Sequence, residues 1–250
     1  MLSTEMKLTE LVRRLKEFAA TNLECVILFG SAARGDFHEG HSDLNVVCIL
    51  QSLSVEGLGR IATVVKWWCA DLKEPAPLFF TEEELKHAAD VFAIEILDMK
   101  HGRRVLYGAD VVAKIEVPMN LHRVQIEHDL RTTLLKLRQH YLRAPGDSKE
   151  LAPVLRKSFS AVLTLLRHVV IALGEEPPVA AHDIVARSAA LTGSNMAAFG
   201  PLLKLRETGE FHGEIVPVYG AYLKALEKTV DALEHHLPKK EWRRVKNAHS

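Results

Sequence analysis

The spacing of hydrophobic residues changes several times along the first 110 positions. It begins with a helical period, which predicts an amphipathic first helix that ends near residues 21–22. A continuous apolar run from Cys25 to Phe29 follows and stops at Gly30, as expected for a strand buried on both faces. The same reasoning predicts a second helix between Ser54 and Asp71, and further strands at Leu44–Leu50, Pro75–Phe80 and Arg103–Tyr107, the last at an edge of the sheet.

Two further segments complete this part of the chain. Thr81 followed by Glu84 matches a capping box, in which each side chain satisfies a backbone donor of the other, so a short helix should begin there. The segment Ala93–Met99 fits a strand or a helix equally well. Strands and helices therefore mix over the first 110 residues, which indicates an α/β (α+β) unit with a mixed sheet and helices.

Beyond Pro118 the pattern is helical throughout, with Gly and Pro residues as stops between helices. Three long apolar faces recur at helical spacing, within residues 130–141, 155–173 and 222–237. They predict an all-α helical bundle. We expect three parts: an α/β domain at residues 1–115, a bundle at 116–238 and a basic tail at 239–250, with five Lys or Arg residues against the single Glu241.

Composition narrows the class of protein. Lys and Arg total 32, as do Asp and Glu, and this balance argues against a long nucleic acid as the main partner. Three cysteines without a CxxC pair make a disulfide framework improbable. The longest apolar segment, 159–173, is interrupted by Arg167 and His168 and is too short to cross a bilayer. We expect a soluble, cytoplasmic protein without a membrane partner, and a homo-oligomer is left open.

The segment from Leu28 to Asp36 has the residues of an anion site. A buried strand ends in Gly30-Ser31, and the following turn offers backbone N–H groups and a hydroxyl to phosphate oxygens. Arg34 could add a cation against a polyphosphate. Asp43 and Asn45 follow, and strand alternation places both on one face of the next strand, beside that phosphate site.

This combination resembles the nucleotidyltransferase superfamily, the fold of aminoglycoside nucleotidyltransferases, DNA polymerase beta-like enzymes and minimal nucleotidyltransferases. The shared motif is an apolar strand, Gly-Ser, a spacer of about ten residues, and Asp-x-Asp or Asp-x-Glu between apolar residues. Gly30, Ser31 and Asp43 match it. The resemblance covers roughly residues 23–110, and a helical C-terminal half is found in several of the relatives that act on small molecules.

The resemblance implies a site for two Mg²⁺ ions and a nucleoside triphosphate, with ATP as the expected nucleotide. Asp43 and the residue at position 45 would hold the metals together with a carboxylate from a later strand. Asn45 replaces the second carboxylate by a neutral amide. If 77–80 is the later strand, it offers only Leu78, Phe79 and Phe80; if 93–99 is that strand, Glu95 or Asp98 could serve.

Three functions follow as hypotheses. The first is an enzyme that transfers a nucleoside monophosphate to a hydroxyl of a small molecule or protein. The second is a pseudoenzyme that keeps the fold to bind a nucleotide or a regulatory partner, as an antitoxin does, and Asn45 favours it slightly. The third is a HEPN-like ribonuclease module, from the spacing of Arg123 with His128 and of Arg206 with His212. His38 and His41 are a weaker candidate for a metal pair.

Overall fold

The computed structural model describes residues 3–34 and 43–235. Contacts divide the chain into two compact units, residues 1–125 and 126–250, with the division inside helix α6 (Met119–Arg143). The domain boundary expected at residue 115 precedes that helix, and the basic tail at 239–250 lies outside the described residues. Each unit is described by itself.

The first unit is built on a four-stranded mixed sheet in the order β3-β2-β1-β4. Its strands are β1 (Leu23–Phe29), β2 (Asn45–Leu50), β3 (Leu78–Phe80) and β4 (Arg103–Tyr107). β1 runs antiparallel to both β2 and β4, whereas β2 and β3 are parallel. All four predicted strands are present, although β3 is shorter than the expected Pro75–Phe80, and β4 lies at an edge as predicted.

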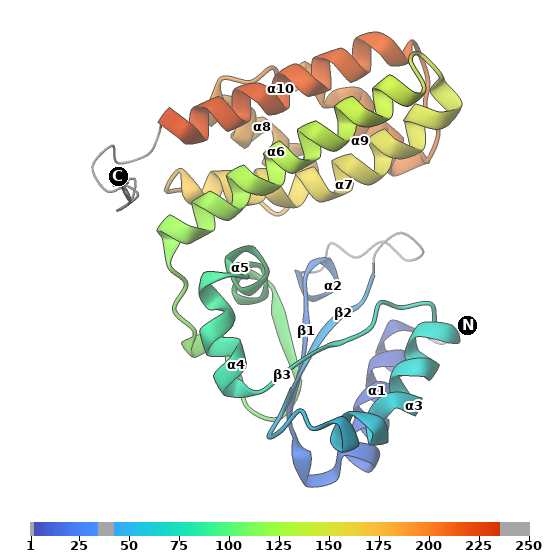
Figure 1. Cartoon of the computed structure of the whole chain (residues 1–250), viewed down its shortest axis with the longest axis vertical. Helices are drawn as coiled ribbons and strands as arrows, with labels where there is room; N and C mark the ends of the chain where they lie inside the picture. The colour runs from blue at the N-terminus through green and yellow to red at the C-terminus, as the bar shows by residue number, and fades with distance from the viewer. Residues whose placement is uncertain (1–2, 35–42, 236–250) are drawn as a thin grey trace, which may run out of the picture. The chain divides into compact units, whose positions relative to one another are not determined.

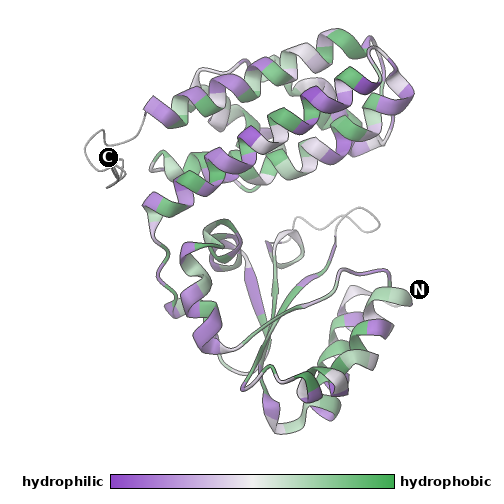
Figure 2. Cartoon of the chain, in the orientation of Figure 1, coloured by the Kyte–Doolittle hydropathy of each residue, from purple (hydrophilic) through white to green (hydrophobic). Residues whose placement is uncertain are grey.

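Helices cover both faces of this sheet (Figure 1). On one face, α1 (Thr4–Ala19) and α3 (Val55–Ala70) pack against the β1 residues Val26 and Leu28. On the other face, α4 (Glu82–His87) and α5 (Ala93–His101) pack against Cys25 and Ile27. β1 is therefore buried on both sides, which explains its unbroken apolar run. Figure 2 shows β1 and β2 hydrophobic along most of their length.

Short helical turns connect the larger elements: α2 (Ser31–Arg34), and the 3-10 helices η1 (Ala20–Asn22), η2 (Ala88–Asp90) and η3 (Val112–Lys114). The capping box before α4 is confirmed. The Glu84 N–H donates to Thr81 Oγ1 at 3.1 Å, and the Thr81 N–H donates to Glu84 Oε2 at 2.9 Å. The helix thus begins where the sequence predicted.

The ambiguous segment Ala93–Met99 is helical, and the strand alternative is wrong. Five of the nine residues of α5 are buried, so its apolar positions show no clear period. Phe92, at the N-cap, supplies no side-chain hydrogen bond. Gln125 supplies one instead: its Oε1 accepts the Ile94 N–H at 3.1 Å, which satisfies a donor that a helix start leaves open.

The second unit is helical, as predicted. It contains most of α6, then α7 (Ser148–Ala172), α8 (Ala181–Thr192), α9 (Gly200–Thr208) and α10 (Ile215–His235), with a 3-10 turn η4 (Met196–Ala198). An aromatic cluster lies in its core, where the rings of Phe159, Phe199 and Tyr222 have centroids 6.1–6.3 Å apart. Tyr219 donates its hydroxyl to the Leu137 carbonyl at 2.7 Å. Among the described helices, none has the length and apolar character needed to cross a membrane.

Candidate functional site

The Gly30-Ser31 turn follows the last residue of β1. Gly30 has φ +81°, a backbone conformation that side chains with a Cβ disfavour, and an added Cβ would lie 3.2 Å from Asn45 Nδ2. Its carbonyl accepts the N–H groups of Ala33 (3.1 Å) and Arg34 (3.2 Å), and its own N–H donates to the Gly102 carbonyl (3.1 Å). The N–H groups of Ser31 and Ala32 are therefore the ones at which an anion could dock.

The start of β2 lies beside this turn. Asn45 is the register partner of Phe29, the last residue of β1, so its amide stands next to Gly30. Leu44 and Val46 are buried against α1 and α3. Asn45 is half-buried and Asp43 is exposed. The structure thus brings Gly30 and Asn45 together, with Asp43 two residues earlier in the same chain segment.

β3 is the neighbour of β2 in the sheet and holds the residue next to Asn45 and Val47. Leu78 pairs with Val47, which shares a face of β2 with Asn45, and the Leu78 side chain is 40% exposed. Of the three positions that the sequence offered on this strand for a third carboxylate, Leu78 is therefore the one nearest to Asn45 on the same face. An aliphatic side chain cannot coordinate a metal.

Glu95 and Asp98 lie on α5, not on a strand, so the reading that made them third-carboxylate candidates fails. Glu95 Oε2 accepts a hydrogen bond from Gln125 Nε2 at 3.2 Å. Asp98 Oδ1 lies 3.7 Å from Nη1 of Arg34, and both side chains are largely buried. Asp98 therefore faces Arg34, which belongs to the short helix after Gly30. The sequence had indicated phosphate as the partner of this arginine.

The donor set does not fit a two-metal centre. Across residues 3–34 and 43–235, no group of three or more His, Cys, Asp and Glu side chains is placed to hold a metal ion. The strand ends offer one carboxylate (Asp43), one amide (Asn45) and one aliphatic side chain (Leu78). Mg²⁺ favours anionic oxygen ligands, so these three side chains carry too little negative charge to hold two Mg²⁺ ions. His38 and His41 lie outside the described residues.

Sequence reasoning missed one carboxylate near these residues. Glu74 precedes β3, and its Oε2 accepts the Leu44 N–H at 3.0 Å, between Asp43 and Asn45. Its Oε1 pairs with Lys7 Nζ at 2.6 Å, and the Glu74 side chain is only 8% exposed. No local pattern around Glu74 signals this role, because the partners come from two distant segments of the chain.

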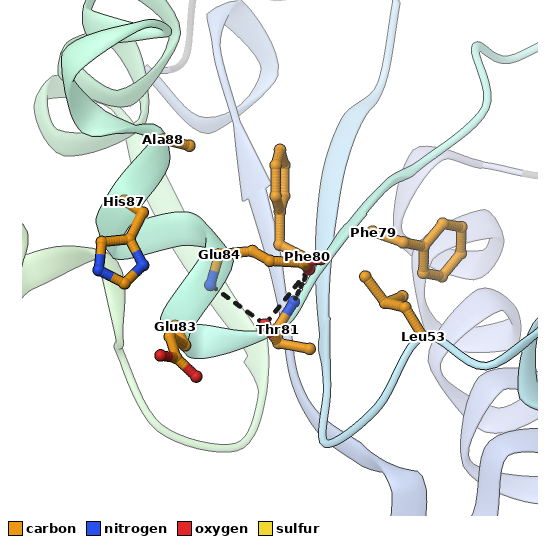
Figure 3. Close-up of a pocket in the computed structure, with 8 residues that line it drawn as sticks. All are labelled: Leu53, Phe79, Phe80, Thr81, Glu83, Glu84, His87 and Ala88. Carbon is orange, nitrogen blue, oxygen red and sulfur yellow. Dashed lines mark hydrogen bonds between the residues drawn. The ribbon is translucent and has the colours of Figure 1, made fainter.

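A cavity of about 620 Å³ lies next to α4, away from the predicted site residues (Figure 3). Leu53 and Phe79 lie on one side of it and His87 on the other, with the capping box of Thr81 and Glu84 between them. Phe79 lies within β3 and the other residues named follow the C-terminal ends of β2 and β3, whereas Asp43 and Asn45 precede or begin β2. The cavity therefore belongs to the opposite end of these strands.

The histidines of the HEPN-like hypothesis lie at the surface, each beside a carboxylate. Arg123 is buried, whereas the His128 side chain is 73% exposed and lies 2.9 Å from Asp129. His212, also exposed, lies 3.6 Å from Glu210. Arg123 and His128 therefore point to different sides of α6, and the structure does not bring this pair together.

Comparison with known proteins agrees with the geometry. Residues 8–127 match the model of a family described as a nucleotidyltransferase domain. The fold is similar to that of spectinomycin adenyltransferase AAD(9) from Enterococcus faecialis, in a crystal structure with ATP and spectinomycin. That similarity has a TM-score of 0.56 and 14% sequence identity, and covers 93% of this chain and 100% of that chain.

Residues 8–127 thus form a nucleotidyltransferase domain, as the Gly-Ser motif implied. A helical region follows this domain. The likeness to the adenyltransferase concerns the fold. Among curated proteins, none matches the chain.

Proposed function

We propose that this protein binds the polyphosphate of a nucleotide at the Gly30-Ser31 turn and is a catalytically degenerate nucleotidyltransferase. The observation that carries the proposal is the side-chain set at the strand ends, where Asp43, Asn45 and Leu78 supply one carboxylate in place of the three that the family resemblance leads us to expect. The nucleotidyltransferase domain supports a nucleotide ligand. The missing negative charge argues against the two-metal transfer step.

The amide of Asn45 changes the charge that a bound ligand meets at this site. A carboxylate at this position would repel phosphate oxygens unless a divalent cation lay between them. The amide carries no charge, and its Nδ2 lies close to Gly30, on the side of the phosphate turn. An N–H donor there can bond a phosphate oxygen directly. We therefore propose that nucleotide binding does not depend on Mg²⁺.

Calorimetry with ATP tests this proposal. The natural chain and Asn45→Asp are titrated in Mg²⁺ and in EDTA. For the natural chain, we expect the Kd to differ by less than about threefold between the two conditions. Asn45→Asp should bind more weakly in EDTA and regain affinity with Mg²⁺, since about 1.4 kcal/mol of repulsion corresponds to tenfold in Kd.

Two variants, one a test and one its control, assign the binding to the turn. Gly30→Ala puts a Cβ into the left-handed conformation against Asn45 and should abolish binding. Gly59→Ala adds a Cβ on α3 with nothing within 4 Å, and should leave the Kd unchanged. Binding of ATP to the natural chain only when Mg²⁺ is present would contradict the proposal.

A second candidate function is transfer of a nucleoside monophosphate to the hydroxyl of a small molecule or protein. It is favoured by the similarity to spectinomycin adenyltransferase, which extends over both the sheet domain and the helical region. The test is pyrophosphate release from ATP with spectinomycin and a wider panel of acceptors. Sustained Mg²⁺-dependent release that Asp43→Asn abolishes would replace the degenerate reading by this one.

A further inference from the structure

Glu74 links three segments of the sheet domain. It follows α3, and its two carboxylate oxygens have different partners: Oε1 pairs with Lys7 Nζ on α1 at 2.6 Å, and Oε2 accepts the Leu44 N–H at 3.0 Å. The side chain is 8% exposed. Both oxygens are therefore engaged within the protein, one by a lysine side chain and one by a backbone N–H.

The backbone around Glu74 is itself fixed. Lys73 has φ +61°, a left-handed conformation uncommon for a residue with a side chain. On the other side, the Pro75 carbonyl accepts the indole N–H of Trp68 at 2.9 Å, and the Trp68 side chain is fully buried. A strained residue before Glu74 and a buried anchor after it hold the carboxylate in one place.

The target of this carboxylate is the point at which β2 begins. Leu44 lies between Asp43 and Asn45, and its side chain is buried against α1 and α3. Its N–H precedes the residues of the strand, which starts at Asn45. A hydrogen bond to a charged acceptor is shorter and stronger than one between neutral groups, so Glu74 sets where the chain enters the sheet.

We propose that Glu74 is a positioning residue for the nucleotide site: by holding the Leu44 N–H, it fixes Asp43 and Asn45 beside the Gly30-Ser31 turn. This inference rests on the proposed nucleotide-binding function. Glu74 itself does not touch the nucleotide. Its removal therefore changes the geometry of the site without removing any group that binds phosphate.

The experiment compares Glu74→Ala and Glu74→Gln with a matched control, Glu84→Ala. Glu84 is also a carboxylate that accepts a backbone N–H next to a strand, that of Thr81, but at the other end of β3. Lys7→Met is the fourth variant, since it removes the ion pair and leaves the bond to Leu44. For each folded variant, the Kd for ATP and NMR amide exchange and shifts are measured.

Glu74→Ala should weaken ATP binding by about three- to tenfold, a coupling of about 0.6–1.4 kcal/mol. Glu74→Gln, which keeps one acceptor oxygen for Leu44, should recover part of this loss. Glu84→Ala should lower the melting temperature and leave the Kd unchanged, and Lys7→Met should affect the Kd less than Glu74→Ala. The amide signals of Gly30 and Asn45 should shift in Glu74→Ala and not in Glu84→Ala.

Failure of the two proposals can be told apart. If the natural chain does not bind ATP under any condition, the nucleotide-binding proposal is wrong. The positioning role of Glu74 is then tested by the NMR measurements alone. Shifts of Gly30 and Asn45 confined to the Glu74 variants then support it. Unchanged signals at both residues, or equal ATP affinity of Glu74→Ala and the natural chain, overturn it.

Discussion

The guanidinium of Arg34 and the carboxylate of Asp98 connect the phosphate turn to α5, with Nη1 of Arg34 lying 3.7 Å from Oδ1 of Asp98. The two side chains are 12% and 16% exposed, so the pair is largely withdrawn from water. The alkyl part of Arg34 packs on Gly102, whose carbonyl accepts the Gly30 N–H. Arg34 therefore stabilises the Gly30-Ser31 turn through its packing on Gly102, in addition to carrying a positive charge.

Asp98→Asn should destabilise the protein. The substitution removes the charge that faces a largely buried guanidinium, and we expect a loss of about 1–3 kcal/mol in the free energy of unfolding. Urea denaturation measures it. Glu95→Gln is the control on the same helix, because its partner is the neutral Gln125, and it should cost less. Equal losses in the two variants would contradict a special role for the Arg34–Asp98 pair.

The same pair gives a test of whether Arg34 binds phosphate. If Arg34 serves as a support, Arg34→Ala and Asp98→Asn should both weaken ATP binding, because each disturbs the turn. If Arg34 binds phosphate, Asp98→Asn should instead strengthen binding by leaving the guanidinium to the nucleotide. We expect the first outcome, and calorimetry of the two variants decides between them.

Gly102→Ala should perturb the turn through Arg34. A Cβ at position 102 would lie 2.2 Å from Arg34 Cγ, so the arginine must move, at a cost of about 1–3 kcal/mol. Gly59→Ala, on the exposed side of α3, should instead raise stability by about 0.5–1 kcal/mol, since alanine favours a helix. Thermal melts of both variants should therefore shift in opposite directions.

The three cysteines should react with a thiol reagent in two classes. Burial raises the pKa of the Cys25 thiol to about 11 and that of Cys48 further still, so neither forms thiolate near neutral pH. Cys69 is only partly buried. We expect one equivalent to react in the native protein and three after unfolding. Rapid reaction of more than one native equivalent would contradict the packing of β1 and β2.

Asp110 should make stability depend on pH in the acid range. A side-chain hydrogen bond from Arg103 holds the pKa of the Asp110 carboxyl below its usual value. Because the folded pKa lies below the unfolded value of about 3.9, the stabilisation is complete above that value and is lost as pH falls through the folded pKa. Melting temperatures measured between about pH 2 and pH 6 should fall less steeply for Asp110→Asn than for the natural chain.

The sequence predicted the elements whose signals are local. The apolar run of β1 reflects helices on both faces of the sheet, and the Thr81–Glu84 box needs only residues three positions apart. The segment of α5 could not be assigned, because burial on most sides removes the periodicity that separates helix from strand. The Gly-Ser motif indicated the nucleotidyltransferase family from the sequence, because its residues are close together in the chain.

The remaining features of the site depend on distant segments. The sequence indicated phosphate binding for Arg34 and could not show its contact with Asp98, because Asp98 is contributed by a helix that the sequence left undecided. Glu74 was missed because its partners, Lys7 and Leu44, are distant in the sequence and approach it only after the chain has passed through α3 and turned at the left-handed Lys73. Neither relationship leaves a mark in local residue spacing.

Gln125 makes the first turns of α6 part of the sheet domain, because its side chain completes the start of α5 through Ile94 and also contacts Glu95. Anyone dissecting the protein by limited proteolysis or truncation should therefore cut after this residue. A fragment that stops at the end of η3 would leave the N-terminus of α5 without its cap, and fraying there would spread toward Asp98 and the turn it supports.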